Sequence, residues 1–185
     1  MSQEQALTGV RILDFSQVLA GPFATQQLAQ LGAQVIKIEQ PVGGDMTRGL
    51  MSSSSDGMAP SFLSANLGKR SLALDLKNPD AREIVHKLVV QADVVVENFK
   101  PGTIERLGYG YEALRAIKPD LVYASISGFG QTGPRAGLPA FDGAIHASSR
   151  TMSISGHPEP GPVRSGYFAV DMSTALNAAF AITAA

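Results

Sequence analysis

The stretch that decides the fold class is residues 9–48, GVRILDFSQVLAGPFATQQLAQLGAQVIKIEQPVGGDMTR. Residues 10–15 are mostly apolar, as in a buried strand, and residues 35–39 repeat that character. Between them, residues 23–31 have the apolar periodicity of a short helix, and Pro22 is suited to the first helical position. A strand, a helix and a second strand in this order predict the βαβ opening of a nucleotide-binding fold.

The turn that joins the first strand to this helix is residues 17–22, QVLAGP, and it holds a single glycine, Gly21. A dinucleotide-binding turn uses three glycines, for the tight turn, the approach of the pyrophosphate and the packing of the helix. We therefore expect a ligand other than NAD in this crevice. Glu39, which could bind a ribose in a dinucleotide site, is interpreted as structural. A dinucleotide-binding oxidoreductase domain is the alternative that the missing glycines disfavour.

Strands and helices continue to alternate along the chain. Further strands are predicted at residues 72–76, 94–99 and 121–127, and further helices at residues 79–92, 104–107, 111–117 and 172–185. Asn78 is suited to cap the second helix and Pro79 to open it. Long loops, which often carry function, are predicted at residues 41–64 and 128–139. This alternation predicts an α/β fold, a Rossmann-like open parallel sheet with helices on both faces.

Composition limits the possible classes of protein. The 185 residues are 44% hydrophobic, enough for the core of one domain, and the formal net charge is −1. Such a small charge gives no global attraction for nucleic acid or an anionic membrane, so we expect neither as a partner. There is no cysteine, and the N-terminal residues lack the basic flank of a signal peptide. We therefore expect a cytoplasmic protein without disulfides or cysteine metal sites.

Ordered sequence blocks extend along the chain. They are residues 44–49 (GDMTRG), 66–71 (NLGKRS), 74–77 (LDLK), 92–99 (ADVVVENF), 101–102 (PG) and the aspartate at position 171. Together with residues 9–48 they resemble the class III coenzyme A transferases (CaiB/BaiF-like), the family that includes formyl-CoA transferase and the carnitine and bile-acid CoA transferases. Each block alone is a weak signal, but their order covers nearly the whole chain. The resemblance implies that the chain is the N-terminal part of the large CoA-transferase domain.

The resemblance also implies where coenzyme A binds, because ligands of open parallel sheets lie at the carboxyl ends of the strands. Lys77 and Arg106 are expected to meet its phosphates, while Asn98, Phe99 and the backbone of residues 18–20 frame the pantetheine and adenine. The full expected set is Gln17, Val18, Ala20, Leu74, Lys77, Asn98, Phe99 and Arg106. Outside this resemblance, a single lysine or arginine is most often an ordinary surface cation, and Leu74 fits the core in either case.

Asp171 is the candidate catalytic residue. It follows a glycine- and proline-rich loop and precedes the apolar helix predicted at residues 172–185, a context similar to that of the family's catalytic aspartate. In the mechanism that the resemblance implies, its carboxylate attacks an acyl-CoA thioester to form a mixed anhydride, and an aspartyl-CoA thioester follows. A carboxylate is anionic at neutral pH, so this attack needs no general base, metal or NAD. The alternative is that Asp171 only caps the helix.

Three positions depart from the patterns of related enzymes and bear on the substrate. Leu19 stands where formyl-CoA transferase has a glutamine near the thioester, and Gln40 stands where it has an arginine. The change at Leu19 disfavours formate and oxalate and favours a larger or more apolar acyl group. The related α-methylacyl-CoA racemases have a histidine where this chain has Phe141, and a phenyl ring transfers no proton. A transferase is therefore favoured over a racemase, which stays an alternative.

The resemblance implies that residues 1–185 form a single CoA-binding α/β domain and that the second domain of the family is absent. Family members are much longer, and this chain stops at Ala185 inside a predicted helix. We therefore expect an interlocked homodimer or a complementary chain, with an acyl-CoA and a carboxylic acid as the small-molecule partners. A non-catalytic CoA-binding fragment is the remaining alternative.

Overall fold

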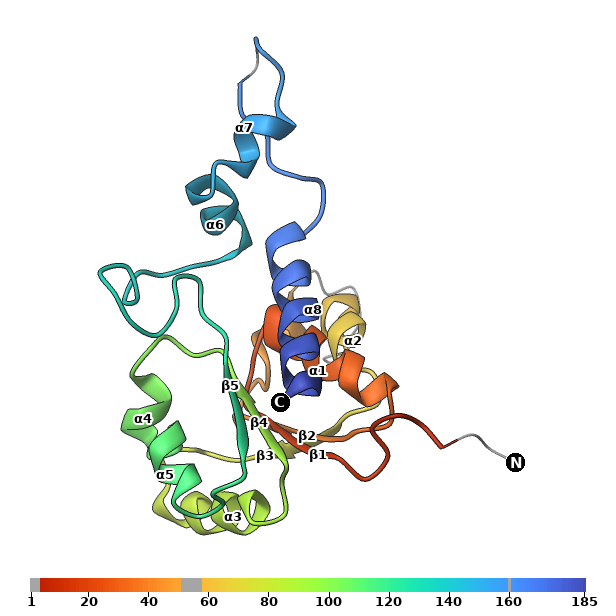
Figure 1. The fold of residues 1–185 in the computed structure, drawn as a ribbon, viewed down its shortest axis with the longest axis vertical. Coiled ribbons are helices and arrows are strands. Elements are labelled where there is room, and N and C mark those ends of the chain that lie inside the picture. Colours follow the sequence, from red (N-terminus) through yellow and green to blue (C-terminus); the bar gives the residue numbers. More distant parts are fainter. Residues whose placement is uncertain (1–3, 51–57, 160) are drawn as a thin grey trace.

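The structure is a computed structural model, and it describes residues 4–50, 58–159 and 161–185. A five-stranded sheet forms its centre, and every neighbouring pair of strands is parallel. The strands are β1 (Arg11–Asp14), β2 (Gln34–Glu39), β3 (Arg70–Ala73), β4 (Val94–Glu97) and β5 (Val122–Ser125), in the spatial order β3-β2-β1-β4-β5 (Figure 1). This order reverses direction between β1 and β4, the position at which open parallel sheets bind ligands. The predicted open parallel sheet is confirmed.

Helices cover both faces of the sheet, as predicted (Figure 1). One face is covered by α1 (Ala20–Gln30) and α8 (Ala169–Ala184), with α2 (Pro60–Asn66) beside α1. The opposite face is covered by α3 (Pro79–Val89), α4 (Thr103–Leu107) and α5 (Tyr111–Arg115). The other helical segments are the 3-10 turn η1 (Met46–Gly49), α6 (Asp142–Ser148) and α7 (Thr151–Ser155).

Alternate side chains of the strands build two separate cores. Leu13 of β1 faces one way and belongs to the core that includes Val85 of α3. Its neighbour Ile12 faces the other way and belongs to the core that includes Leu28 of α1 and Ala175 of α8. Successive side chains of a strand point to opposite faces, so a strand covered on both faces must be apolar along its length. The short apolar runs in the sequence therefore mark strands of a two-sided sheet.

The prediction that Pro22 takes the first helical position is wrong, because α1 begins at Ala20. Proline is tolerated throughout the first turn, since the amide groups there have no acceptor within the helix. Gly21 permits the close approach of this turn to the end of β1, because a Cβ at this position would lie 2.2 Å from the Cβ of Ser16. The single glycine of the turn therefore serves helix packing.

Two other boundaries differ from the prediction. β3 occupies Arg70–Ala73 rather than residues 72–76, and as an edge strand it tolerates polar residues at its exposed positions. Leu74 and Leu76, which suggested a longer strand, pack against the core from the turn that follows. The predicted loop at residues 41–64 contains η1 and the start of α2, while residues 51–57 lie outside the described part of the chain.

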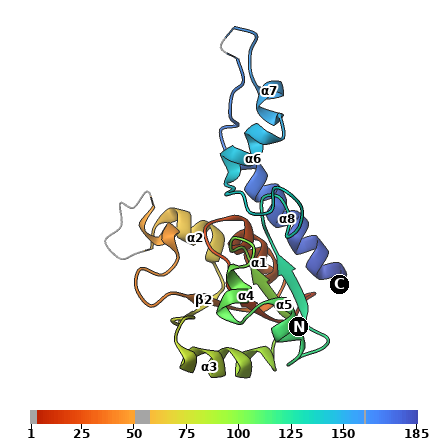
Figure 2. The ribbon, with the colours of Figure 1, turned by 90° about the vertical axis from the view of Figure 1, so that its left-hand side faces the viewer.

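Residues 142–155 form α6 and α7, two short helices that were not predicted from the sequence. Both project away from the sheet, and α7 lies at the far end of the molecule (Figure 2). α8 begins beside α6 and runs from there across the sheet to the C-terminus (Figure 2). Because α8 begins at Ala169 and not at residue 172, Asp171 lies inside its first turn.

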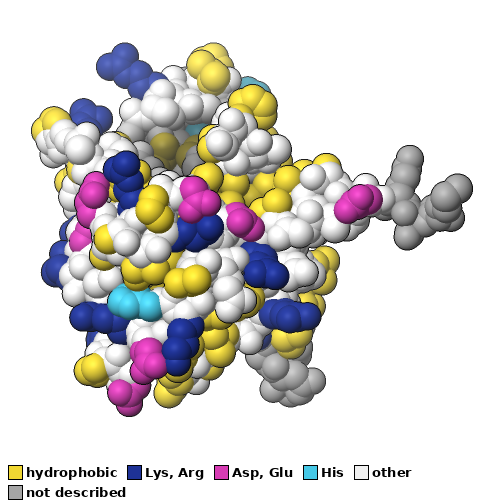
Figure 3. Space-filling model, turned by 60° about the horizontal axis from the view of Figure 1, so that its bottom comes forward, with side chains coloured by type: hydrophobic (Ala, Val, Ile, Leu, Met, Phe, Trp, Pro, Cys, Tyr) yellow, Lys and Arg dark blue, Asp and Glu magenta, His cyan; other side chains and the backbone are white. Residues whose placement is uncertain are grey.

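None of the helices within residues 4–50, 58–159 and 161–185 is long and apolar enough to span a bilayer. On the face of the molecule that is lowest in Figure 1, Lys and Arg side chains are interspersed with acidic ones (Figure 3). A nucleic-acid interface gathers its basic side chains on one surface, and this face does not do so.

Candidate active site

The loops that follow β1 and β4 meet at the point where the strand order reverses. The backbone NH of Gln17 donates to Asn98 Oδ1 at 2.8 Å, and Asn98 Nδ2 donates to the carbonyl of Gln17 at 2.7 Å. Asn98 lies just beyond β4, which ends at Glu97 rather than at Phe99 as predicted. Both polar atoms of the Asn98 amide therefore hold the loop after β1 in place.

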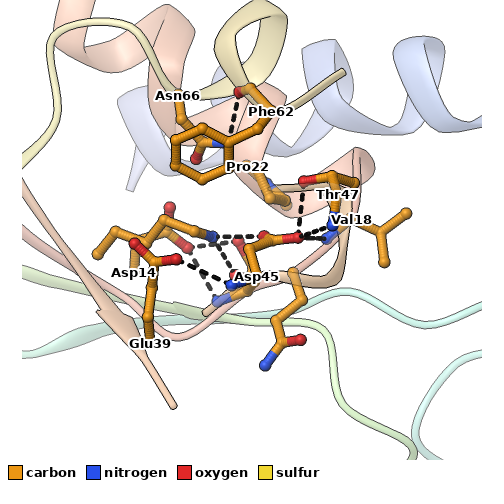
Figure 4. Close-up of polar contacts among 12 residues, drawn as sticks. Asp14, Val18, Pro22, Glu39, Asp45, Thr47, Phe62 and Asn66 are labelled. Atoms are coloured by element: carbon orange, nitrogen blue, oxygen red, sulfur yellow. Dashed lines mark hydrogen bonds and ion pairs between the residues drawn. The ribbon is translucent and has the colours of Figure 1, made fainter. Parts of the chain in front are cut away.

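Side chains from the protein interior hold the same loop. Asp45 accepts the NH of Val18 through its two carboxylate oxygens at 3.3 and 3.2 Å, and Lys37 Nζ donates to the carbonyl of Ser16 at 2.6 Å. The Asp45 carboxylate is directed at Val18 and Thr47 (Figure 4). Val18 has a φ of 70°, a left-handed conformation that is rare for a β-branched residue. Such strain persists only where the surroundings impose it, and it concentrates at functional sites.

Two buried ion pairs lie behind this loop. Lys37 Nζ is 2.9 Å from Asp45 Oδ2, and Lys69 Nζ is 2.9 Å from Asp14 Oδ2. Asp14 and Lys37 are partners in the register of β1 and β2, so both lie on the α1 face of the sheet. All four side chains are at most 2% exposed, so each charge is stabilised by protein groups and not by water.

The network also changes the acidity of its carboxyl groups. Burial alone would raise the pKa of Asp14, but two neighbouring lysines and two hydroxyl donors outweigh it and hold that pKa well below its usual range. Burial acts on Glu39 in the same way, but hydrogen bonds from Arg48 at 2.7 Å and Ser71 at 2.6 Å lower its pKa to about 2. Both carboxylates stay ionised at neutral pH. These contacts agree with the structural interpretation of Glu39.

A cavity of about 410 Å³, here named the central pocket, opens between the loop after β1 and the start of α8. Apolar side chains that include Leu19, Ile126, Leu138 and Phe141 form part of its lining. The predicted site residues in its lining are Gln17, Val18, Ala20, Asn98, Phe99 and Asp171. The fold thus brings the candidate nucleophile and most of the expected CoA-contacting residues into one cavity.

Asp171 is the third residue of α8. Burial and the negative charge of Asp142 raise its pKa to about 6, while Arg164 acts in the opposite direction. The N-cap of the helix is Phe168, so Asp171 does not occupy the capping position. Among the residues that the structure describes, none donates a hydrogen bond to its carboxylate. Its side chain is therefore available to a ligand in the central pocket.

A second cavity, of about 320 Å³ and here named the basic pocket, lies between the turn after β3 and α4. It brings together Lys77, Arg82 and Arg106 beside Tyr109. Gly108 ends α4 with a φ of 88°, and a Cβ at this position would lie 2.9 Å from the Arg82 guanidinium. The glycine therefore both permits the turn and makes room for the third cation of the pocket.

Leu74 differs from the other predicted site residues, because it packs against the core and is not part of the described lining of either cavity. Within the described residues, no group of three or more His, Asp or Glu side chains is placed to hold a metal ion.

Residues 7–185 match the sequence profile of CoA-transferase family III. The chain belongs to this family. The resemblance found in the sequence is therefore confirmed, and the open parallel sheet is the fold of a family III CoA-transferase chain.

Proteins named as CoA-transferases, and one solved structure, are similar to nearly the whole chain. Succinate–glutarate CoA-transferase from Agrobacterium fabrum is 42% identical over 190 residues, which cover 100% of this chain and 48% of that protein. Succinyl-CoA:mesaconate CoA-transferase from Haloarcula hispanica is 47% identical over 188 residues, covering 97% and 47%. A solved CaiB/BaiF family protein from Brucella suis has a TM-score of 0.93 at 40% identity, covering 98% and 49%. The chain therefore spans about half the length of these relatives.

Several polar residues around the two cavities were not predicted, among them Lys37, Asp45 and Arg82. Lys37 interrupts the apolar strand between Ile36 and Ile38, and a charge in that position is a sequence signal for a buried partner. Asp45 lies inside the block GDMTRG that contributed to the resemblance, but its buried role has no local signature. Arg82 shares α3 with a second cation, Lys87, and only the fold brings Arg82 to the basic pocket.

Proposed function

We propose that this chain carries the CoA-binding region and the nucleophile of an acyl-CoA:carboxylate CoA-transferase, with residues 1–185 as its N-terminal α/β domain. The observation that carries the proposal is the Asp171 carboxylate in the same cavity as the loop after β1. With a pKa of about 6 it is ionised at neutral pH, yet it is more basic than a solvated aspartate. Both properties suit a nucleophile that attacks a thioester without a general base.

The two cavities suit the two ends of coenzyme A. In the basic pocket, Lys77 and Arg106, joined by Arg82, would supply separated positive charges for the phosphates. The acyl-pantetheine arm would lie past Phe99 and reach Asp171 in the central pocket. Support comes from the location of both cavities. Their linings include residues that follow the carboxyl ends of strands, where open parallel sheets bind ligands.

The reaction would proceed by successive acyl exchanges. An oxygen of the Asp171 carboxylate attacks the thioester carbon of the donor, the carbon–sulfur bond breaks, coenzyme A leaves as a thiolate, and the donor acyl group is left joined to Asp171 in a mixed anhydride. The thiolate attacks the aspartyl carbon of the anhydride, which releases the donor acid and leaves an aspartyl-CoA thioester. The acceptor carboxylate then runs the same two steps in reverse, forming its own CoA thioester and regenerating Asp171. Each step exchanges one acyl bond for another, so no ATP is consumed.

The start of α1 would stabilise the negative charge that develops during these steps. Leu19 is the N-cap of α1 and provides no side-chain capping bond, and it lines the central pocket together with Ala20. The first amides of a helix carry partial positive charge and favour anions. We expect the thioester oxygen to lie against this helix end.

The lining of the central pocket bears on the substrate. Leu19, Leu138 and Phe141 form an apolar wall, which supports an acyl group larger than formyl. The names of several relatives specify succinate, glutarate or mesaconate, acids that are larger than formate and oxalate. We therefore expect succinyl-CoA to have a higher kcat/KM as donor than formyl-CoA. A preference for formyl-CoA would contradict the inference from Leu19.

Phe141 also bears on the racemase alternative. It lines the central pocket, and its phenyl ring cannot exchange a proton with the carbon next to a thioester. Racemisation needs an acid and a base on opposite faces of that carbon. The residue therefore supports acyl exchange over racemisation.

Thermal unfolding of the 185-residue chain tests the binding step. A ligand that binds only the folded state raises Tm by mass action, and the rise grows with the ratio of free ligand concentration to Kd. We expect a rise with coenzyme A and none with NAD, and we expect the rise to be lost in Lys77→Ala combined with Arg106→Ala. Lys87→Ala, which removes an exposed cation on α3, is the matched control and should keep the rise. A rise with NAD alone would refute the ligand assignment.

Acyl exchange by the active assembly that contains this chain tests the chemical step. Asp171→Ala should abolish exchange and keep the CoA-induced rise in Tm, because the nucleophile is removed while the binding surface stays. Asp120→Ala, which removes an exposed aspartate, should retain the exchange activity. Substantial exchange in Asp171→Ala would refute the assignment of the nucleophile.

We propose further that the chain acts with a second copy of itself or with a complementary chain. Support comes from Leu176 and Phe180 of α8, which are 54% and 74% exposed. Apolar side chains exposed along one helix favour association. Light scattering should show a species larger than the monomer, and a monomer with an enzyme's exchange rate would contradict this proposal.

A further inference from the structure

The first turn of α8 has no cap of its own. Its N-cap residue is Phe168, whose side chain cannot accept a hydrogen bond, and the first amides of a helix have no partner within the helix. The acceptor comes from another helix. Asp142, the first residue of α6, accepts the NH of Val170 at 2.9 Å and the NH of Asp171 at 3.3 Å, both through Oδ2.

The other oxygen of this carboxylate is also paired. Asp142 Oδ1 accepts a hydrogen bond from Arg164 Nη2 at 3.2 Å, and the Asp142 side chain is only 3% exposed. A buried carboxylate is stable only when its oxygens have such partners. The Arg164 guanidinium lies 5.2 Å from the ring centre of Phe168. Asp142 therefore joins α6, the loop before α8 and the first turn of α8, although it lies 28 residues from Val170 in the sequence.

We propose that Asp142 is a positioning residue for Asp171: by capping α8 from outside the helix, it fixes the turn from which the Asp171 carboxylate enters the central pocket. The proposal rests on the proposed function, because it requires that Asp171 reacts. No described residue donates a hydrogen bond to the Asp171 carboxylate, so the backbone sets the direction of this side chain. Asp142 holds the backbone amide of Asp171 itself.

Asp142 also places a negative charge beside the nucleophile. Burial and this charge raise the pKa of Asp171, and the positive charge of Arg164 opposes them. Removal of the Asp142 charge should therefore make Asp171 a stronger acid, and removal of the Arg164 charge should make it a weaker one. These two opposite shifts distinguish an electrostatic contact with Asp171 from a general loss of structure.

Other charged or titratable groups lie on elements around the start of α8. Lys100 lines the central pocket from the loop after β4, and His146 is buried on α6. Tyr123 belongs to β5 but packs in the core on the opposite face of the sheet. α1, which packs along α8, has no titratable side chain. None of these groups is altered by the substitutions below, so they contribute equally to every variant compared.

The test uses three variants. Asp142→Asn removes the negative charge but keeps an oxygen that can accept hydrogen bonds from the NH groups of α8. Asp142→Ala removes both the charge and the acceptor. Arg164→Gln removes the positive charge that opposes Asp142. The titration of Asp171 is followed by carboxyl ¹³C NMR of the 185-residue chain, with its resonance identified by loss in Asp171→Asn. The pH dependence of kcat/KM is measured in the active assembly. Far-UV circular dichroism monitors the helix content of each variant.

We expect Asp142→Asn to lower the pKa of Asp171 by roughly one unit and to move the acidic limb of the pH–rate profile with it. Arg164→Gln should move both in the opposite direction. Asp142→Ala should lower kcat by roughly 100-fold with a much smaller change in KM, because a misplaced nucleophile binds substrate but reacts slowly. Asp120→Asn, at an exposed aspartate, is the matched control and should change none of these quantities.

An unchanged titration of Asp171 in Asp142→Asn, or an unchanged kcat in Asp142→Ala, would overturn the proposal. If Asp142→Ala fails to fold, the Asn and Gln variants decide, because Asn has nearly the shape of Asp and the Arg164 side chain is 48% exposed. Failure of the proposed function would look different. Exchange would then persist in Asp171→Ala, while the NMR titration, which needs no activity, would still report whether Asp142 acts on Asp171.

Discussion

The two walls of the central pocket are held in different ways. The wall at the loop after β1 rests on buried ion pairs, of which Lys37–Asp45 has side chains only 1% and 0% exposed. The wall at α8 rests on the pair Asp142–Arg164, in which the arginine side chain is 48% exposed. Breaking a buried pair leaves an unpaired charge away from water, so such pairs allow few alternative arrangements. The wall expected to bind CoA is therefore rigid, while the wall that carries Asp171 is more easily adjusted.

The walls also respond to pH with opposite sign. Glu39 has a folded-state pKa of about 2, so it stabilises the fold above its unfolded pKa and loses this contribution as the pH falls toward 2. Asp171 has a raised pKa of about 6, so the folded state holds its proton more tightly and the fold loses stability as the pH rises from about 4 to 6. At neutral pH, ionised Glu39 stabilises the fold and ionised Asp171 destabilises it. Such a loss of stability is common at a reactive group.

The largest effect should come from breaking the buried wall. Asp45→Ala removes the carboxylate that forms an ion pair with buried Lys37 and should lower the free energy of unfolding by about 3–5 kcal/mol in urea unfolding. Glu83→Ala, which breaks the exposed pair with Lys87, is the control and should leave the unfolding curve unchanged. A small loss in Asp45→Ala would mean that the buried pairs do not hold this wall.

A smaller, pH-dependent loss should follow from Glu39→Gln. At pH 7 the variant should be less stable by about 1–2 kcal/mol, allowing for solvent screening of the partly exposed Arg48. Near pH 2 the Glu39 carboxyl is protonated in the unfolded state and about half protonated in the folded state, so most of the difference between the two proteins should be lost. A loss that is equal at pH 7 and pH 2 would assign the effect to packing instead of charge.

The wall at α8 should show the reverse. Asp171→Asn removes a carboxyl group with a raised pKa and should increase the free energy of unfolding at pH 8 by about 1 kcal/mol after allowance for screening. The gain should vanish as the pH falls to about 3, where Asp171 is mostly protonated in both states. Urea unfolding at the two pH values measures both quantities. Destabilisation by Asp171→Asn at pH 8 would contradict the raised pKa.

The smallest effect on stability is expected at Val18. Val18→Gly relieves a left-handed φ of 70° but makes the unfolded chain more flexible, so the net change should stay within about 1 kcal/mol. The Kd for coenzyme A should nevertheless rise, because the loop loses its fixed shape. Isothermal titration calorimetry on the 185-residue chain gives the Kd. An unchanged Kd would show that the strain at Val18 has no role in binding.

Local sequence patterns were sufficient for much of the fold. Asn78 was predicted to cap a helix, and its side chain accepts the NH of Asp80 at 3.0 Å with Pro79 as the first helical residue. The strands were found because both faces of the sheet are covered, which makes their sequences apolar over a few residues. The edge strand β3 was misplaced because it is not covered in this way, and its exposed positions are polar.

The polar architecture of the site could not be predicted in the same way. The ion pair between Lys69 and Asp14 joins residues 55 positions apart, and Asp142 contacts Val170 across 28 positions. No local periodicity encodes such separations, because only the packing of the strands and helices brings the partners together. Asp171 could be named because the ordered family-like blocks identified it. No pattern in the sequence pointed to its neighbour Asp142.

Chemical trapping of the acyl-enzyme tests the central claim most directly. The active assembly is incubated with an acyl-CoA, treated with hydroxylamine, digested and analysed by mass spectrometry. Hydroxylamine converts an aspartyl anhydride or aspartyl thioester to a hydroxamate, so the account predicts this modification at Asp171, only when acyl-CoA is present, and none in Asp171→Asn. Steady acyl exchange with an unmodified Asp171, or with the hydroxamate on another residue, would contradict it.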